Sequence, residues 1–177
     1  RAGELEAHGL AFITPSTVTG QEEDKQALAF TFAEILSKTR PGVRCARLPE
    51  TLGAVNRTGL TEDYKRMYRD YRDTGIFHRD LLRRVGEASG ARYLVQLKLS
   101  GFSQGSQGRW SFLGIRMVDT KIASLRLFFQ IWDSQEGTIA WEGVQELTHA
   151  VDSYEAINIT FRAAVEQAAH NLIARLP

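Results

Sequence analysis

Several features that often reveal a protein's chemistry are scarce in this chain. Its one cysteine, Cys45, excludes an intrachain disulfide framework and a zinc site built from several cysteines. Its 22 basic and 21 acidic residues leave a net charge of +1, so neither nucleic acid nor an anionic bilayer is attracted in general. No apolar run approaches the roughly 20 residues of a membrane helix. We therefore expect no transmembrane helix, no nucleic-acid partner, and recognition through local surfaces.

Motifs for metals, nucleotides and acid-base catalysis are also missing. None of the four histidines stands four residues from another or in an H-E-x-x-H frame: His8, His78, His149 and His170. Residues 14–20 lack both glycine spacings of phosphate-binding loops. The acidic groups at 22–24 and around Asp70 suit helix ends and polar helix faces. The sequence therefore predicts no metal, no cofactor and no enzymatic activity.

One short motif does suggest catalysis. Gly101, Ser103 and Gly105 have the G-x-S-x-G spacing of a hydrolase nucleophile elbow, and aspartates and histidines follow them in the chain. An elbow needs a helix directly after the serine, whereas residues 104–109 are rich in Gly, Ser and Gln. We expect residues 103–118 to form a loop between strands, and a serine hydrolase using Ser103 is the less favoured alternative.

Hydrophobic periodicity predicts the secondary structure that is present. Strands with alternating apolar residues, or short apolar runs, are predicted over 9–14, 43–48, 91–100, 122–133 and 138–148. Helices are predicted from Glu22 to the stop at Arg40, over 49–56, 61–74 and 78–89, and from a cap at Ser153 to the chain end. Gly137 closes the turn that follows Asp133. Residues 1–8 are expected to be a linker or disordered, and Cys45 a small buried core residue.

The order of these elements is β-α-β-α-α-α-β-β-β-α, which predicts an α/β fold in one domain over residues 1–177. Helical crossovers favour a sheet that is parallel in its first part, and the last three strands form an antiparallel meander. We expect helices on one face of this mixed sheet and water on the other. The wet face would carry polar residues around Leu94, Phe128 and Trp132.

Three surfaces are candidates for binding. Tyr64, Tyr68 and Tyr71 form a helical stripe, which we interpret as packing on the domain with hydroxyls at the surface. The polar sheet face is a second candidate, although a plain solvated face is favoured there. The third is the aromatic end of the expected loop, because ordered aromatic rings contribute strongly to binding, although packing of these rings on the core or in an extended strand is favoured there. Its candidate partner-binding residues are Trp110, Phe112, Arg109 and Arg116.

A family resemblance adds to this picture. Residues 10–15 before an amphipathic helix, residues 89–95 entering a strand, and the D-x-x-x-G hairpin of 127–142 resemble the bacterial envelope lipoproteins related to the TolB N-terminal domain. That group includes the LpoB-like activators of penicillin-binding proteins and the curli-secretion protein CsgG. The resemblance runs in order from about residue 8 to 176.

The resemblance implies a noncatalytic α/β domain that faces the periplasm and binds an envelope protein, as a regulator of cell-envelope or peptidoglycan assembly. It also implies anchoring to the outer membrane by a lipid attached upstream of Arg1. The alternative is a structural subunit of an oligomeric envelope or secretion assembly, self-associating through sheet edges or the wet sheet face. Neither the partner nor its binding residues follow from the family motifs.

Overall fold

The computed structural model describes residues 3–18, 20–109, 118–152 and 161–177, and within these ranges only the backbone of 102–109, 118–123, 149–152 and 161. The described elements are α1 (Glu4–His8), β1 (Leu10–Phe12), β2 (Ser16–Thr17), α2 (Glu22–Thr39), β3 (Cys45–Ala46), α3 (Leu48–Arg57), α4 (Thr61–Thr74), α5 (Arg79–Ser89), β4 (Tyr93–Arg109), β5 (Val118–Asp133), β6 (Thr138–Asp152) and α6 (Phe161–Ile173). The predicted α/β fold class and element order are confirmed.

The described sheet is mixed, as predicted. Its strands run in the order β3-β1-β4-β5-β6, and β2 pairs with β4 beyond the end of β1. β1 is parallel to both β3 and β4, whereas β4, β5 and β6 form the antiparallel meander. The parallel pairs require crossovers, which α2 and the group α3, α4 and α5 provide.

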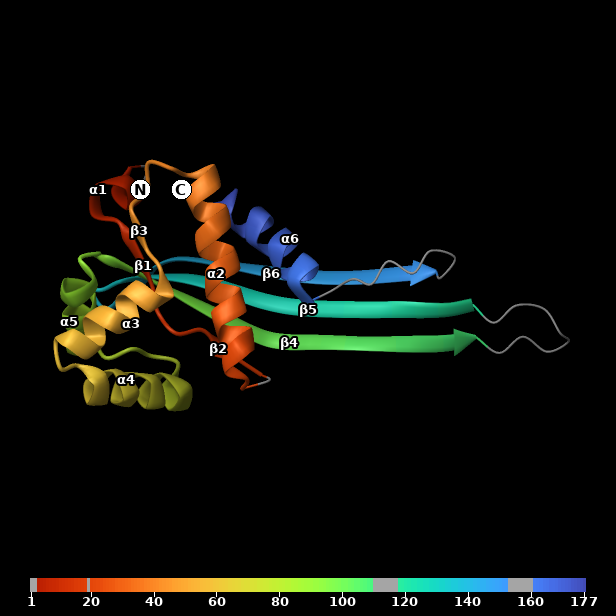
Figure 1. Ribbon diagram of the computed structural model, residues 1–177, viewed down its shortest axis with the longest axis horizontal. Coiled ribbons are helices and arrows are strands. Elements are labelled where there is room, and N and C mark those ends of the chain that lie inside the picture. The colour runs from red at the N-terminus through yellow and green to blue at the C-terminus, as the bar shows by residue number, and fades with distance from the viewer. Residues whose placement is uncertain (1–2, 19, 110–117, 153–160) are drawn as a thin grey trace, which may run out of the picture.

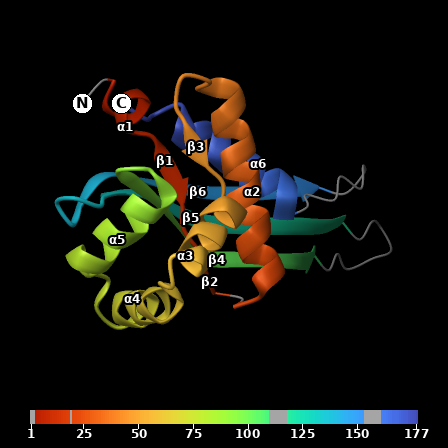
Figure 2. The same cartoon turned by 60° about the vertical axis from the view of Figure 1, so that its left-hand side comes forward.

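Helices cover both faces of the sheet (Figures 1 and 2). α2 and α6 pack on one face, where Phe32 of α2 meets Phe129 of β5 edge to face with ring centroids 5.4 Å apart. On the opposite face, α3, α4 and α5 enclose a second core around Met67, Phe77 and Trp132. The expectation of one wet face is therefore wrong near the start of β4, and the layers number three.

Polar residues in the strands made this second core hard to predict from the sequence. Leu94 and Gln96 of β4 are fully buried, and Trp132 is 4% exposed. A strand that alternates apolar and polar residues predicts one solvated face, but Gln96 here is hydrogen-bonded beneath α4. Lys98, one step further along the same face, is exposed. The solvated face thus begins where the cover of α4 ends.

Several element boundaries differ from the prediction. Residues 4–8, expected to be a linker, form α1, and Leu5 is buried. β4, β5 and β6 all extend beyond their predicted ends, by nine residues in the case of β4, which ends at Arg109 rather than Ser100. β3 is reduced to Cys45–Ala46. α6 is described from Phe161, so the predicted cap at Ser153 lies outside the described residues.

Cys45 packs at the margin of the core. Its side chain is partly buried against the α2 and α6 side of the sheet. Burial, with the negative charge of Glu50 as a smaller cause, raises the pKa of the thiol to about 12. The thiol is protonated at neutral pH, as suits the predicted structural role.

Candidate functional site

The expected binding loop is largely strand. Residues 103–109 belong to β4 and Val118 opens β5, and backbone pairing runs to Arg109 opposite Val118. The prediction of a loop over 103–118 is therefore wrong for these positions. Arg109 is the last residue of β4, while Trp110, Phe112 and Arg116 lie outside the described residues. Gly, Ser and Gln have little intrinsic preference for strands, but cross-strand pairing overrides that preference here.

The course of β4 is not compatible with a nucleophile elbow at Ser103. Gly101, Ser103 and Gly105 pair with Arg126, Ser124 and Ile122 of β5. β4 continues beyond Gly105, so the chain makes no sharp strand-to-helix turn at the serine, and no described helix begins there to supply an oxyanion hole. The hydrolase alternative at Ser103 is contradicted by this geometry.

The outer parts of β4, β5 and β6 project from the body of the protein (Figure 1). β4 and β5 pair without a break from Gly101 opposite Arg126 to Arg109 opposite Val118, and β6 follows β5 out to Asp152. The described helices lie around the other end of these strands. We call residues 101–109, 118–126 and 146–152 the projecting sheet.

A bulge marks the base of the projecting sheet. The register between β4 and β5 shifts between Leu99 and Gly101, so Ser100 is the extra residue. Bulges strengthen the local twist and redirect a strand. Beside it lies a shallow hollow of about 250 Å³ lined by residues that include Ser100, Arg126 and Glu146. The side chains of Arg126 and Glu146 form an ion pair and are both more than half exposed.

The tyrosine stripe of α4 packs on the domain as predicted, but its hydroxyls face the sheet rather than the surface. The N–H of Thr14 donates to the Tyr64 hydroxyl at 2.9 Å, and the Tyr68 hydroxyl donates to the Thr14 carbonyl at 2.7 Å. Gln96 places Oε1 3.2 Å from the Tyr68 hydroxyl and donates through Nε2 to Ser16. Burial raises the pKa of Tyr68 well above its ordinary value.

A second set of bonds joins the end of α4 to β5 and β6. The hydroxyl of Tyr71 and the indole N–H of Trp132 both donate to Oε1 of Gln130, at 3.1 and 3.2 Å. Gln130 in turn donates to the carboxylate of Glu142. Burial raises the pKa of Tyr71, and the charge of Glu142 adds to this effect. These bonds satisfy the buried polar groups and fix α4 across the inner half of the sheet.

The D-x-x-x-G hairpin is held by its aspartate. Asp133, with its side chain 7% exposed, accepts hydrogen bonds from Arg92 Nε at 3.1 Å and Arg92 Nη2 at 2.7 Å. Oδ1 of the same carboxylate accepts the N–H groups of Gln135 and Glu136. Gly137 closes the turn with a φ of 72°, which confirms its predicted role. The aspartate therefore serves the structure of the turn.

The described residues hold no cluster of three or more His, Cys, Asp or Glu side chains arranged to bind a metal ion. Among the described helices, none is long and apolar enough to cross a membrane. Gln96 and Gln130 were expected on the polar, solvated sheet face, and sequence reasoning missed that they bind the tyrosine hydroxyls of α4. Their signal was a polar residue between two apolar residues of a strand, and it cannot be told from a solvated strand without the tertiary structure.

Comparisons with known proteins find similar folds among solved structures only. No protein-family model matches the chain, and no curated protein matches its sequence. The solved structure of lipoprotein GNA1162 from Neisseria meningitidis matches with a TM-score of 0.50 and 14% identity, over 96% of this chain and 99% of that one. A proposed homolog of the neuraminyllactose-binding hemagglutinin from Helicobacter pylori matches with a TM-score of 0.54 and 10% identity, over 96% and 86%.

A third solved structure is less similar. The C-terminal domain of LpoB from Salmonella enterica matches with 13% identity over 79% of this chain and 82% of that one, but its TM-score of 0.46 is too low to carry an argument. At these identities a likeness shows the fold alone. The chain shares its fold with a bacterial lipoprotein.

Proposed function

We propose that this chain is a noncatalytic domain of a bacterial envelope lipoprotein, related to the TolB N-terminal group, that binds another envelope protein and so regulates cell-envelope or peptidoglycan assembly. The proposal places it in the periplasm, anchored to the outer membrane by a lipid. The fold shared with the Neisseria lipoprotein supports the envelope assignment. The strand that runs through Ser103 supports a role without catalysis.

The observation that carries partner binding is the projecting sheet. A soluble domain buries both faces of a sheet where it can, because apolar groups and strand edges left open invite association. In this protein three adjacent strands continue past the described helices (Figure 1). Strands that extend past the described helices are expected of a part that contacts another molecule.

We propose that contact centres on the far end of this sheet. Arg109 and Val118 end the paired region, and residues 110–117 join them. This connection contains Trp110, Phe112 and Arg116. Tryptophan and arginine are enriched among the residues that dominate binding energies, and phenylalanine is enriched at interfaces. These three residues, with Arg109, form the proposed partner-binding set.

The test is site-specific photocrosslinking in the bacterial envelope. A photoreactive phenylalanine analogue replaces Phe112 in one variant and Glu62, an exposed residue of α4, in the matched control. Position 112 should form a discrete crosslinked product with an envelope protein, and position 62 should not. Trp110→Ala combined with Phe112→Ala should reduce recovery of that partner at least about tenfold, since each anchor contributes more than about 1 kcal/mol.

Crosslinking from position 62 equal to that from position 112 would contradict the assignment of the contact. An unchanged recovery of the partner by the double alanine variant would do the same. Thermal unfolding of each variant verifies that the fold is intact. Recovery of the protein outside the envelope fraction would contradict the proposed compartment.

A structural subunit of an oligomeric assembly is the second candidate. β6 ends the described sheet order, so its outer edge faces no described strand. Ile139 and Val144 on this strand are 43% and 38% exposed. Exposed strand edges with apolar residues favour pairing with another chain.

Sedimentation velocity across a wide concentration range tests this candidate. The native chain should form a defined oligomer, and Val144→Lys should shift it toward monomer because a charged residue on an edge strand opposes pairing. Val18→Lys, at an exposed apolar residue next to β2, is the matched control and should have no such effect. Only monomer at high concentration would exclude self-association through β6.

A further inference from the structure

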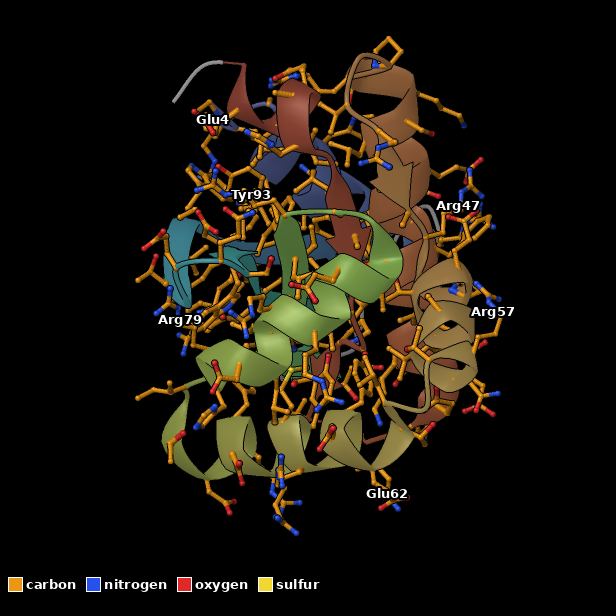
Figure 3. The ribbon with its side chains drawn as sticks, turned by 90° about the vertical axis from the view of Figure 1, so that its left-hand side faces the viewer. Glu4, Arg47, Arg57, Glu62, Arg79 and Tyr93 are labelled. Carbon is orange, nitrogen blue, oxygen red and sulfur yellow. The ribbon has the colours of Figure 1, made fainter. Side chains whose placement is uncertain are left out.

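A groove lies at the end of the protein opposite the projecting sheet. It has a volume of about 620 Å³ and is lined by α1, α5 and the turn between β5 and β6. These elements lie at one end of the long axis and the projecting sheet at the other (Figure 1). Figure 3 views that end, with Arg79 beside the turn. No part of the groove belongs to the surface proposed above.

α5 forms the length of the groove. Arg79, Arg83, Gly86 and Glu87 of this helix and Gly90 after it all line the groove. The helix has 11 residues and is therefore about 16 Å long. A Cβ atom at Gly86 would lie 2.5 Å from Oγ of Ser134, so glycine allows the helix to lie against the turn. Gly86 and Gly90 also leave the backbone accessible to a ligand along this side of the groove.

Arg79 is fixed at one end of the groove. Its Nε donates to the carbonyl of Gln135 at 2.8 Å. Its stem lies against Gly137, where an added Cβ atom would come within 2.8 Å of the Arg79 Cβ. Within the described residues its two terminal nitrogens have no hydrogen-bond partner. Arg83 lies one helical turn away, is exposed, and approaches Glu87 only to 3.9 Å.

Arg44 is fixed at the other end. Its guanidinium donates to the carbonyl of Gly90, at the C-terminus of α5. Its stem passes Gly9, where an added Cβ atom would lie 3.3 Å from Arg44 Nε. Neutral carbonyls thus hold Arg44 and Arg79 in place without cancelling their charges. Arg92 also lines the groove, but the carboxylate of Asp133 neutralises it.

The spacing of these charges selects the ligand. Three guanidinium groups, of which only that of Arg83 has a carboxylate nearby among the described residues, at 3.9 Å, are spread along about 16 Å, whereas a single phosphate needs donors that converge on one point. Guanidinium groups bind carboxylates with two parallel hydrogen bonds. An extended peptide rises about 3.3 Å per residue, so about five residues span the groove. Glu87 and Glu136 interrupt the positive charge, which disfavours a uniform anionic surface such as a bilayer.

We infer that this groove binds a short acidic peptide segment of another protein, whose carboxylates pair with Arg79 and Arg83 at one end and Arg44 at the other. This binding is independent of the proposed function of the projecting sheet. Because the two surfaces lie at opposite ends, the protein is able to hold an acidic segment while its projecting sheet contacts a different molecule.

The experiment measures binding of fluorescein-labelled hexaglutamate to the whole chain by fluorescence anisotropy at low ionic strength. Saturable binding is expected, and hexaglutamine should not bind. Arg79→Gln combined with Arg83→Gln should weaken binding about fivefold or more, since two exposed ion pairs are lost. The matched control is Arg47→Gln combined with Arg57→Gln, two exposed arginines on the far side from Arg79 in Figure 3, and it should leave binding unchanged.

Equal weakening by both double variants would overturn the inference, because it would indicate general attraction to positive charge. So would the lack of saturable binding up to about 1 mM. Inorganic phosphate, or phosphatidylglycerol vesicles, that bind more tightly than hexaglutamate and lose binding in the Arg79/Arg83 variant would assign the groove to another ligand. Arg83→Glu alone, at a side chain that is 55% exposed, provides a variant whose fold is not at risk, and it too should weaken binding.

Discussion

Replacing Asp133 by Asn tests how the β5–β6 hairpin is held. The amide keeps one oxygen, which can still accept the N–H groups of Gln135 and Glu136 as Oδ1 does. It replaces the other oxygen with an NH₂ group that faces the guanidinium of Arg92, where two donors then meet. The change therefore removes the charge and the two bonds from Arg92 to Oδ2. It leaves Oδ1 in place as the acceptor of the turn and of Arg92 Nε at 3.1 Å.

The magnitude follows from the geometry of this pair. Hydrogen bonds to a charged group contribute about 1.5–3 kcal/mol each, and Arg92 donates to Oδ2 through Nε at 3.1 Å and through Nη2 at 2.7 Å. The Asp133 side chain is 7% exposed but that of Arg92 is 25% exposed, so water recovers part of the loss. We expect the free energy of unfolding to fall by about 2–3 kcal/mol. The melting temperature should fall by about 4–12 °C for a chain of this size.

Urea unfolding followed by circular dichroism measures this change, and its pH dependence gives a second readout. Burial alone would raise the pKa of Asp133, but the bonds from Arg92 and from two N–H groups outweigh burial and leave the pKa below its usual value. The stabilisation is complete above the unfolded pKa of about 4 and is lost as the pH falls through the folded value. The difference between native protein and variant should therefore be constant near neutrality and shrink below about pH 4.

Asp73→Asn is the matched control. Asp73 pairs with Arg72 at 3.3 Å on the surface of α4, and its side chain is 61% exposed. This change should cost less than about 0.5 kcal/mol. If Asp133→Asn cost no more than Asp73→Asn, or if its effect persisted unchanged at acid pH, the charged pair would not be what holds the hairpin.

Two further predictions concern a turn and a buried hydroxyl. Gly137→Ala should destabilise the protein by more than about 2 kcal/mol, because it combines positive φ with a contact of 2.8 Å to Arg79. Gly59→Ala has the same φ but open space around it, so it should cost only about 1–2 kcal/mol, and equal costs would refute the clash. Tyr68 has a raised pKa, so its stabilisation holds below the unfolded value of about 10 and is lost at higher pH. Tyr68→Phe should therefore reduce the alkaline loss of stability measured by urea unfolding above about pH 10, and an unchanged loss would mean that this phenol titrates freely.

Much of the fold follows from local sequence signals. The stripe of Leu28, Phe32 and Leu36 produces α2, which ends before Pro41 as expected. Asp133 and Gly137 set the hairpin, and alternation sets the register of the meander. These features depend on residues close in the chain, so periodicity and turn chemistry are sufficient to predict them.

The second core, under α3, α4 and α5, could not be predicted from such local signals. Gln96 and Gln130 look like solvated strand residues, but Gln96 is buried and Gln130 partly buried. The hydroxyls of Tyr68 and Tyr71, from a distant helix, are among the partners that make this burial favourable. Tertiary hydrogen bonds therefore override the solvated strand face that the local pattern predicts at these two residues. The helices of the opposite face, α3, α4 and α5, were each predicted, but their position on the sheet was not.

The candidate site was predicted less well than the fold. Residues 103–109 have a composition typical of a loop, and their strand depends on pairing with β5 rather than on their own preferences. The groove arginines are spread from Arg44 to Arg83 in the sequence, and only the approach of α5 to the β5–β6 turn brings them to one groove. Without that long-range contact they resemble ordinary surface charges.

The C-terminus has a consequence for the free edge of the sheet. Nη2 of Arg175, just beyond α6, donates to the carbonyl of Val144 at 3.1 Å and to Oε1 of Gln145 at 3.2 Å. The carbonyl of Val144 is an acceptor that a pairing strand would need. A foreign strand can add to β6 at this point only after Arg175 has withdrawn. Arg175 thus blocks strand addition at this point of the β6 edge, and removing the residues after α6 should make the protein more prone to aggregate.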